Sequence, residues 1–339
     1  MKGCSLSNHG RGSTRGKVIA FIVFIVGVFA GATGCAFDAS ISAEITDLVE
    51  PAVVETTESL AFTPTLIPEM VSIGTVSATP TLVPTPHPPF FQGPIEFGRS
   101  FDGRRLKVYR LGTGPFARAI VGGIHGGYEW NTVELVDEMV THLQRHTDTI
   151  PVTVTLYIIP CANPDGYAAG TDPIIARMNG NGVDLNRNWD YQWQSVATHG
   201  RRLVNAGARA FSEPETDALR RLIEEKDIEL LIFYHSAMEG AIFSGAERDK
   251  SATYELAEML ASVIGYRHWT QGVPGQITTG DAIDWLSAEK GIAAVEIELT
   301  THDSVLDTPE WQQNLDGVEA FLRWSIPPAD GTLLKHARE

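Results

Sequence analysis

Hydrophobic positions follow two different periods along residues 95–326. Residues 104–112 alternate between polar and apolar positions, as expected of a strand. Four further runs are short, apolar and rich in β-branched residues, as in strands buried on both faces of a sheet, and they occupy residues 117–126, 152–160, 228–236 and 292–300. In 131–146 the apolar residues instead step by three and four, which predicts a helix with one buried face.

A second helix is predicted over 212–225. Ser212 opens this segment, Glu215 follows three residues later as in a capping box, and Pro214 lies in the first turn. Strands that alternate with helices are typical of α/β proteins. The pattern therefore predicts a single α/β domain over 95–326, with a central mixed, largely parallel twisted sheet flanked by helices.

The N-terminal segment has the pattern of a secretory signal. Four basic residues and no acidic residue precede Cys35, and residues 18–34 form an apolar run. The segment ATGC at 32–35 resembles a bacterial lipobox, in which the cysteine would carry lipid. A retained single span is the alternative, since the run is barely long enough to cross a bilayer of about 30 Å. Residues 1–35 are thus predicted as a signal peptide with lipobox or as a membrane anchor, and both place the domain outside the cytoplasm.

Residues 36–94 are predicted to form a disordered linker. They hold nine of the 19 prolines among many threonines, and they contain no lysine or arginine. Proline lacks the N–H donor and fixes φ, so this segment favours an extended spacer that holds a domain away from a surface. Residues 327–339 are predicted to be a tail.

Composition narrows the possible partners. The net charge of −16 argues against nucleic acid, because phosphate binding needs basic patches. Of the three cysteines only Cys161 belongs to the predicted domain, so no intrachain disulfide is expected there.

Functional groups gather where the predicted strands end. His125 and Glu129 follow the run that ends at Ile124, His235 follows the run LLIFY, and Glu298 lies late in 292–300. Ligands of α/β sheets bind at the carboxyl ends of strands. Two histidines and a carboxylate with an open fourth position are typical of a catalytic zinc site.

Two glutamates of the run 292–300 need an explanation of their own. Glu296 and Glu298 are two residues apart, so they face the same side of the strand. A buried carboxylate costs several kcal/mol unless it is paired or bound to metal. A glutamate beside a zinc site can accept a proton from water and pass it to a leaving amine.

The motifs of the domain occur in an order that carries a family resemblance. They read FGRSFDGRRL, GGIHGGYE, NPDGY, GVDLNRNW, FSEPET, YHS, DW and EIEL, over roughly residues 95–325. With them the chain resembles the zinc metallocarboxypeptidase family related to carboxypeptidase A, and especially its small bacterial branch near the murein-peptide amidases. The resemblance implies a carboxypeptidase A-like fold with one Zn²⁺ per chain.

The same resemblance implies the metal ligands and the base. His125, Glu129 and His235 correspond to the zinc ligands, and Glu298 corresponds to the general base. Asp184 would be the partner that orients His125, a common need of a zinc-bound imidazole.

Substrate-binding roles follow from the resemblance as well. Arg177 would stabilise the oxyanion, Asn186 and Arg187 would clamp the terminal carboxylate of the substrate, and Ile283 would line the specificity pocket. An aliphatic residue there favours apolar terminal residues, but Asp281 could reverse this preference if it points inward.

Three features depart from the family pattern. The first two ligands are spaced H-x-x-x-E rather than H-x-x-E. The substrate-capping tyrosine has no evident counterpart, with Gln276 near its place and Tyr266 well upstream. Glu296 competes with Glu298 as the base, and Glu298 is preferred because the family motif pairs the glutamate with a following leucine.

The expected function is that of an extracytoplasmic zinc-dependent metallocarboxypeptidase, tethered to the membrane by lipid or anchor, or secreted. It would hydrolyse a C-terminal peptide bond or a murein-peptide amide bond, so its partners would be peptides or muropeptides. The alternatives are a catalytically silent peptide-binding lipoprotein and a zinc deacylase of N-acyl amino acids.

Overall fold

A computed structural model describes residues 90–245, 251–270 and 278–326 of the 339-residue chain. The predicted signal segment, nearly all of the predicted linker and the tail lie outside these residues, as does Gln276. The chain divides into two units, and every described residue belongs to the second unit, 80–339. Within the described ranges, no helix is both long enough and apolar enough to cross a membrane.

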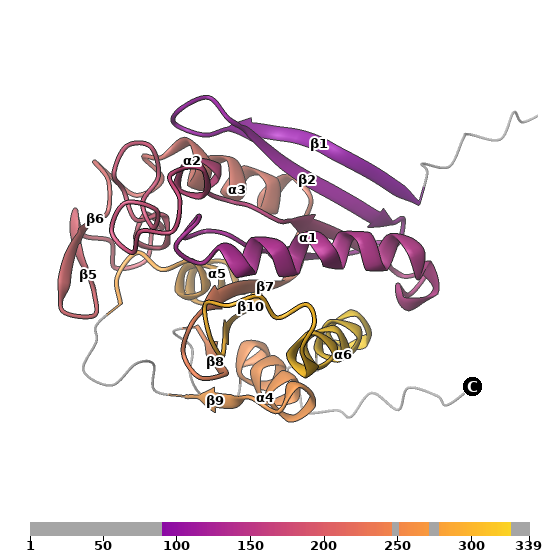
Figure 1. The fold of residues 1–339 in the computed structure, drawn as a ribbon. Helices are drawn as coiled ribbons and strands as arrows, with labels where there is room; N and C mark the ends of the chain where they lie inside the picture. Colours follow the sequence, from indigo (N-terminus) through magenta and orange to yellow (C-terminus); the bar gives the residue numbers. More distant parts are fainter. Residues whose placement is uncertain (1–89, 246–250, 271–277, 327–339) are drawn as a thin grey trace, which may run out of the picture. The chain divides into compact units, whose positions relative to one another are not determined.

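The core of the domain is an eight-stranded sheet (Figure 1). Its strand order is β1-β2-β4-β3-β7-β10-β8-β9. The central pairs β4–β3, β3–β7 and β7–β10 are parallel, whereas β1–β2, β2–β4 and β10–β8 are antiparallel. The prediction of a mixed, largely parallel sheet is therefore confirmed. The strands are β1 (Phe91–Arg99), β2 (Arg105–Gly112), β3 (Phe116–Val121), β4 (Val154–Ile159), β7 (Ile228–Ser236), β8 (Ala241–Ser244), β9 (Arg267–Trp269) and β10 (Ala293–Leu299).

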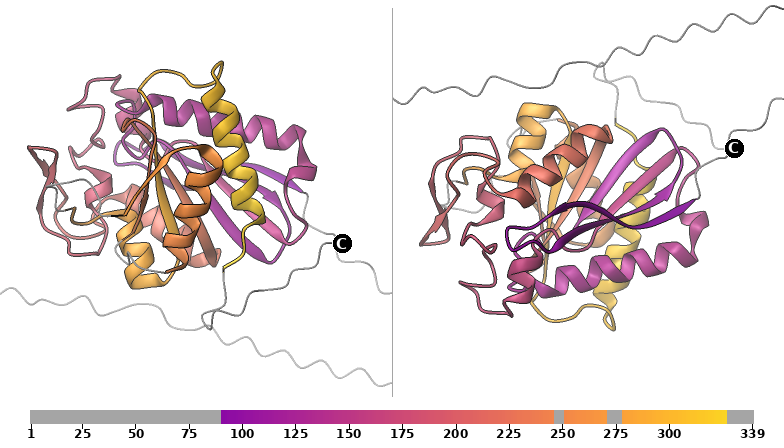
Figure 2. Two further views of the ribbon diagram at one scale, coloured as in Figure 1. Left: turned by 90° about the horizontal axis from the view of Figure 1, so that it is seen from below. Right: turned by 90° about the horizontal axis from the view of Figure 1, so that it is seen from above.

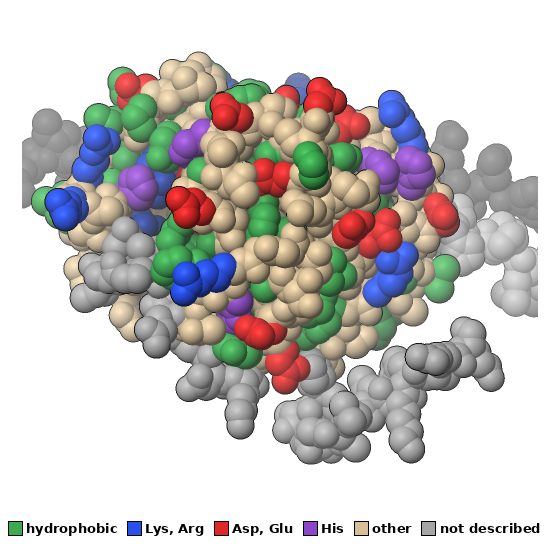
Figure 3. Space-filling view, turned by 60° about the horizontal axis from the view of Figure 1, so that its bottom comes forward, with side chains coloured by type: hydrophobic (Ala, Val, Ile, Leu, Met, Phe, Trp, Pro, Cys, Tyr) green, Lys and Arg blue, Asp and Glu red, His purple; other side chains and the backbone are tan. Residues whose placement is uncertain are grey.

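Helices cover both faces of this sheet (Figure 2). One core cluster joins the sheet to α1 (Trp130–Arg145), α4 (Ala252–Ile264) and α6 (Pro309–Arg323). The other joins it to α3 (Pro214–Glu225) and α5 (Ala282–Lys290). On the face drawn in Figure 3, acidic, basic and histidine side chains of the described residues are interspersed.

Alternation along β7 and β10 decides which side chains meet. Leu230, Ile232 and Tyr234 of β7 pack into the cluster of α1, α4 and α6, whereas Leu231 and Phe233 pack into the other. By the same period of two, His235 of β7 and Glu296 and Glu298 of β10 lie on the face covered by α3 and α5. The parallel register pairs Glu298 with His235. The two glutamates therefore share a face, as predicted, and His235 lies on the same face.

Shorter elements build the rim beside the strand ends. These are the helix α2 (Pro164–Ala168), the 3₁₀ turn η2 (Leu185–Arg187), and a hairpin of β5 (Val196–His199) with β6 (Arg202–Asn205). The other 3₁₀ turn, η1 (Thr147–Thr149), lies between the end of α1 and the start of β4. Trp189, which follows η2, is fully buried, and its ring packs against Phe211, Phe233 and Trp285. This aromatic cluster fixes the loop that carries the motif GVDLNRNW.

Two boundaries differ from the expectation. Strand β1 begins at Phe91, inside the segment predicted as linker, because Phe91 and Gln92 already pair with β2. The capping box predicted at Ser212 is wrong. The N-cap of α3 is Glu213, and Ser212 donates its hydroxyl to the Glu213 carboxylate, while Glu215 accepts from the Phe101 N–H.

Candidate metal centre

Three side chains from the ends of β3 and β7 converge on one point. His125 lies in the turn after β3, Glu129 immediately precedes α1, and His235 is the penultimate residue of β7. Nδ1 of His125 is 2.7 Å from Oε1 of Glu129 and 3.1 Å from Nδ1 of His235. Oε2 of Glu129 is 3.2 Å from the same His235 atom. All three residues are at most 3% exposed.

The chemistry of this donor set fits a zinc ion. Tetrahedral zinc with Zn–N bonds of 2.0–2.1 Å holds its ligand atoms about 3.3 Å apart, close to the separations found here. Each of the three residues offers one ligand atom, and these atoms all lie within 4.8 Å of one another. Oε2 of Glu129 is buried and has no hydrogen-bond partner among the described residues. The three side chains could together hold a divalent cation.

Glycines absorb the extra residue between the first two ligands. Gly126 has a φ of +52°, and a Cβ on it would lie 2.6 Å from backbone atoms of Gly166 and Tyr167. A Cβ on Gly127 would lie 1.9 Å from the Gly170 oxygen. Only glycine allows the turn to pass so close to α2 and the chain that follows it. The tight turn brings Glu129 back to His125 despite the H-x-x-x-E spacing.

Asp184 and Arg177 lie behind His125. Oδ1 of Asp184 is 3.4 Å from Nε2 of His125, and its Oδ2 accepts a 2.8 Å hydrogen bond from Nε of Arg177. Nη1 of Arg177 is 3.5 Å from Oε1 of Glu129, so this buried arginine contacts two carboxylates. Burial acts to raise the pKa of Asp184, but the charges of Arg177 and His125 hold that pKa well below its usual range. The carboxylate therefore stays ionised beside the imidazole.

Glu296 and Glu298 lie on the other side of His235. Oε2 of Glu296 is 3.6 Å from Nε2 of His235, while Oε2 of Glu298 is buried without a hydrogen-bond partner in the described part of the chain. Burial raises the pKa of each glutamate to about 8, and the charge of Glu129 adds to both shifts. A carboxylate with a raised pKa and a free oxygen is suited to exchange protons near neutral pH.

The predicted carboxylate clamp is partly engaged within the protein. The Asn186 side chain accepts from the Ala282 N–H and donates to Oδ2 of Asp281, 3.0 Å away. Arg187 donates to the backbone carbonyls of Thr198 and Asn186. Its Nη2 donates to no described residue. Asn186 thus holds the N-terminus of α5, and Arg187 keeps free N–H groups.

Asp281 and Ile283 do not form an open acidic pocket. Oδ1 of Asp281 caps α5 by accepting from the Ile283 and Asp284 N–H groups, and its other oxygen is held by Asn186. Ile283 is 4% exposed and belongs to the core cluster beneath α5. Asp281 therefore acts as a helix cap, and it does not point freely inward.

A buried polar chain beside the ligands was not anticipated. Asn131 donates to the carbonyls of Thr301 and Asp303, so its oxygen accepts from Ser236, the neighbour of His235. Ser236 in turn contacts Nδ1 of His302 at 3.0 Å. These residues lie far apart in the sequence, and no motif indicated that they meet.

Two ring-bearing residues at the rim of the site, Tyr128 and His199, were also not identified from the sequence. The ring of Tyr128, the residue before Glu129, lies 4.7 Å from His302 and 6.3 Å from His199 on β5. Burial, together with the nearby charge of Arg177, lowers the pKa of His199 to about 4. The unusual spacing in HGGYE could have drawn attention to Tyr128. No sequence pattern around His199 indicated that it lies near the site. Tyr266 does not reach this rim, because its hydroxyl bonds to Glu310 and Asn314 of α6.

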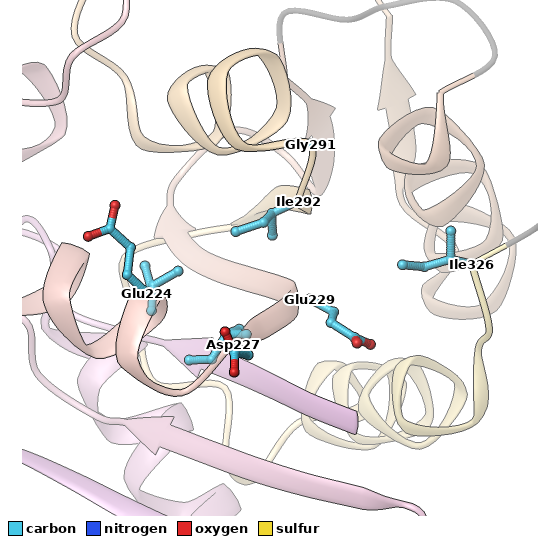
Figure 4. A pocket seen from close by; sticks show the side chains of 8 residues that line it. Glu224, Asp227, Glu229, Gly291, Ile292 and Ile326 are labelled. Atoms are coloured by element: carbon cyan, nitrogen blue, oxygen red, sulfur yellow. The ribbon is translucent and has the colours of Figure 1, made fainter. Parts of the chain in front are cut away.

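A cavity lies at the opposite end of the sheet (Figure 4). It has a volume of 490 Å³ and is lined by residues at the beginnings of β7 and β10 and at the end of α3, among them Glu224, Asp227, Glu229 and Ile292. No histidine or cysteine takes part in its lining. The concentration of metal-binding side chains is therefore separate from this cavity.

A family model described as zinc carboxypeptidase matches residues 88–317. Among characterised proteins, carboxypeptidase B of Astacus astacus is 30% identical over 237 residues, which cover 60% of this chain and 78% of the relative. Murein peptide amidase A of Escherichia coli (strain K12) is 30% identical over 163 residues, which cover 44% of this chain and 61% of the amidase.

Solved structures confirm the fold. Bovine thrombin-activatable fibrinolysis inhibitor, solved in complex with tick carboxypeptidase inhibitor, aligns with a TM-score of 0.56 at 20% identity, over 67% of this chain and 88% of that one. The murein-tripeptide amidase of Escherichia coli O157 aligns with a TM-score of 0.51 at 24% identity, over 71% and 94% of the two chains.

Proposed function

The chain belongs to the zinc carboxypeptidase family, and from this premise we propose that it is an extracytoplasmic metallocarboxypeptidase that removes the C-terminal residue of peptides or muropeptides. It is a zinc hydrolase that uses one zinc ion. The convergence of His125, Glu129 and His235 carries the proposal, because it gathers a buried His₂Glu donor set in one place.

These three residues would hold the metal, and Asp184 would keep His125 in the ligating orientation. When bound, zinc supplies Lewis acidity that polarises a carbonyl and lowers the pKa of water toward about 7. Burial of the ligands excludes bulk water from the reacting carbonyl and strengthens every charge interaction there.

Glu298 is proposed as the general base. It lies opposite His235 in the parallel register and has an oxygen free to accept a proton. In this role it takes a proton from the attacking water and donates it to the leaving amine. Its raised pKa favours the first of these steps, because a carboxylate that binds protons more tightly is a stronger base toward the attacking water.

Arg177 and Arg187 are proposed to bind the negative charges of the substrate. Arg177 lies 3.5 Å from a ligand oxygen, so its guanidinium is near the carbonyl that becomes an oxyanion. Arg187 has unused N–H groups for a terminal carboxylate. Asn186 would support this clamp by fixing the N-terminus of α5 beside it. Ile283 of α5 is proposed to form part of the buried apolar wall of the substrate pocket.

Location and substrate rest on separate features. The basic and apolar N-terminal segment and Cys35 support a position in the cell envelope, reached by secretion or by a lipid or membrane tether. The similarity to a murein peptide amidase supports muropeptides as substrates, and the similarity to a carboxypeptidase B supports ordinary peptides.

A substrate panel tests the proposal. The full-length protein with one equivalent of zinc would be incubated with peptides, the same peptides amidated at the C-terminus, muropeptides and N-acyl amino acids. Mass spectrometry would then locate the bond cut. Release of one terminal residue from free but not amidated peptides or muropeptides is expected, with Glu298→Gln as the inactive control.

Other outcomes decide against it. Cleavage of N-acyl amino acids alone would identify a deacylase. Binding of peptides by the zinc-loaded protein without any cleavage would identify a silent binding protein.

A further inference from the structure

We propose that Glu296 is a positioning residue that orients His235 for metal binding, as Asp184 does for His125. This inference rests on the proposed function, since it assumes that His235 is a ligand. The two histidines are arranged alike: each turns Nδ1 toward Glu129, and each turns Nε2 toward a second carboxylate. The Nε2–carboxylate separations are 3.4 Å for His125 and 3.6 Å for His235.

Proton placement explains why His235 needs such a partner. A neutral imidazole carries one proton, and the ring nitrogen that binds metal must be the one without it. Because Nδ1 faces the other ligands, the proton of His235 has to lie on Nε2. This nitrogen is buried, and no described residue is within hydrogen-bonding distance of it.

The carboxylate of Glu296 is the acceptor that this Nε2–H can reach. At 3.6 Å the two atoms are slightly beyond hydrogen-bonding distance, and a small rotation of either side chain closes the gap. Without an acceptor, the buried N–H would be unsatisfied at a cost of about 1–3 kcal/mol. The ring would then favour the tautomer with the proton on Nδ1, which cannot bind zinc.

This role divides the work between the two glutamates of β10. Glu298 lies opposite His235 in the register and keeps a free oxygen, whereas Glu296 is one pleat earlier and faces the far nitrogen of the ring. Glu296 thus acts through His235, and the base remains Glu298. This placement supports the preference for Glu298 as the base that the sequence motif indicated.

Two matched variants test the acceptor. Glu296→Met and Glu296→Gln both remove the charge and keep the length of the side chain, but only glutamine retains an acceptor oxygen. Zinc affinity of the full-length protein would be measured by competition with a chromogenic chelator. We expect Glu296→Met to weaken zinc binding about 10–100-fold and Glu296→Gln to recover most of that loss. Both variants, saturated with zinc, should keep a kcat within about tenfold of the parent, unlike Glu298→Gln.

A second measurement does not depend on how the variants fold. In ¹⁵N NMR spectra of the zinc-loaded parent, His235 should carry its proton on Nε2. The inference is overturned by a proton on Nδ1, by unchanged zinc affinity in Glu296→Met, or by equal losses in the two variants. A parent protein that binds no zinc would instead overturn the proposed function.

Discussion

The two ends of the central sheet both carry acidic residues, but in opposite surroundings. At the carboxyl ends of β3, β7 and β10, glutamates lie beside histidines and largely away from solvent. At the beginnings of β7 and β10, Glu224 and Glu229 are exposed at the cavity of Figure 4.

Pairing differs between the ends as strongly as burial does. Glu224 is bonded to Lys290 and Arg220, each at 2.7 Å, and exposed pairs of this kind contribute about 0–1 kcal/mol. Oε2 of Glu298 is buried and has no hydrogen-bond partner among the described residues, while Glu129 lies between two buried histidines. An unpaired buried carboxylate is costly to fold, so it marks a site that something else completes. The acidic residues at the cavity are exposed to solvent, so they do not indicate a metal site there.

The largest effect is expected from a ligand. His235→Ala removes one of three donors, so the protein should lose both its bound zinc and its hydrolytic activity. Glu224→Ala at the other end is the matched control and should change neither. Metal analysis after dialysis and a peptide assay measure both, and zinc retained in full by His235→Ala would remove this histidine from the ligand set.

A smaller loss is expected from the base. Glu298→Gln keeps the shape of the side chain but cannot accept a proton, so kcat should fall about 10²–10⁴-fold. Zinc content should remain that of the parent. If the variant hydrolysed peptides at the parental rate, the base would have to be sought elsewhere, and Glu296→Gln assayed in parallel would show where.

Arg177→Lys should have the next effect. Lysine keeps the charge but cannot bridge Asp184 and the reacting carbonyl together, so kcat should fall about 10²–10³-fold. Steady-state kinetics would separate this from binding, because KM should change much less than kcat. A change confined to KM would assign Arg177 to substrate binding alone.

A still smaller effect concerns pH and stability. Glu296 and Glu298 bind protons more tightly in the folded protein, with pKa values raised to about 8 from about 4.3 in an unfolded chain. Their protonation stabilises the metal-free fold fully below pH 4.3, and this contribution is lost as pH rises through about 8. As pH rises from 5 to 8, the loss of these protons should lower the Tm of the metal-free protein. The increase in Tm on adding zinc should therefore be larger at pH 8 than at pH 5. Thermal unfolding with and without chelator measures these Tm values. In the metal-free protein, Glu298→Gln should make the Tm depend less steeply on pH.

The smallest effect is expected at the cavity. Glu229→Gln alters an exposed side chain outside the metal centre, so its free energy of unfolding should change by less than about 0.5 kcal/mol. Denaturant unfolding and the peptide assay check this. A large loss of activity would show that the two ends of the sheet are coupled.

The sequence predicted the regular elements well and indicated three side chains that the structure brings together, for identifiable reasons. Strands buried on both faces leave apolar runs, and ligands at their ends stand out from those runs, as His235 does after LLIFY. The α/β class and the approximate bounds of β7 and β10 followed from these patterns alone.

Contacts between residues that are distant in the chain could not be predicted from the sequence. Glu296 and Glu298 share one face, so the sequence pattern does not show that Glu296 is the one that faces Nε2 of His235. The use of Asn186 at the start of α5 depends on how two loops meet, and local pattern carries no such information. The capping box failed at Ser212 because tertiary contacts claimed the side chain of Glu215.

Anomalous diffraction from crystals of the zinc-loaded protein tests the central claim most directly. The account predicts one zinc peak per chain, about 2.0–2.2 Å from Nδ1 of His125, Nδ1 of His235 and a carboxylate oxygen of Glu129. A peak bound by other residues, or none at these three side chains, would contradict it.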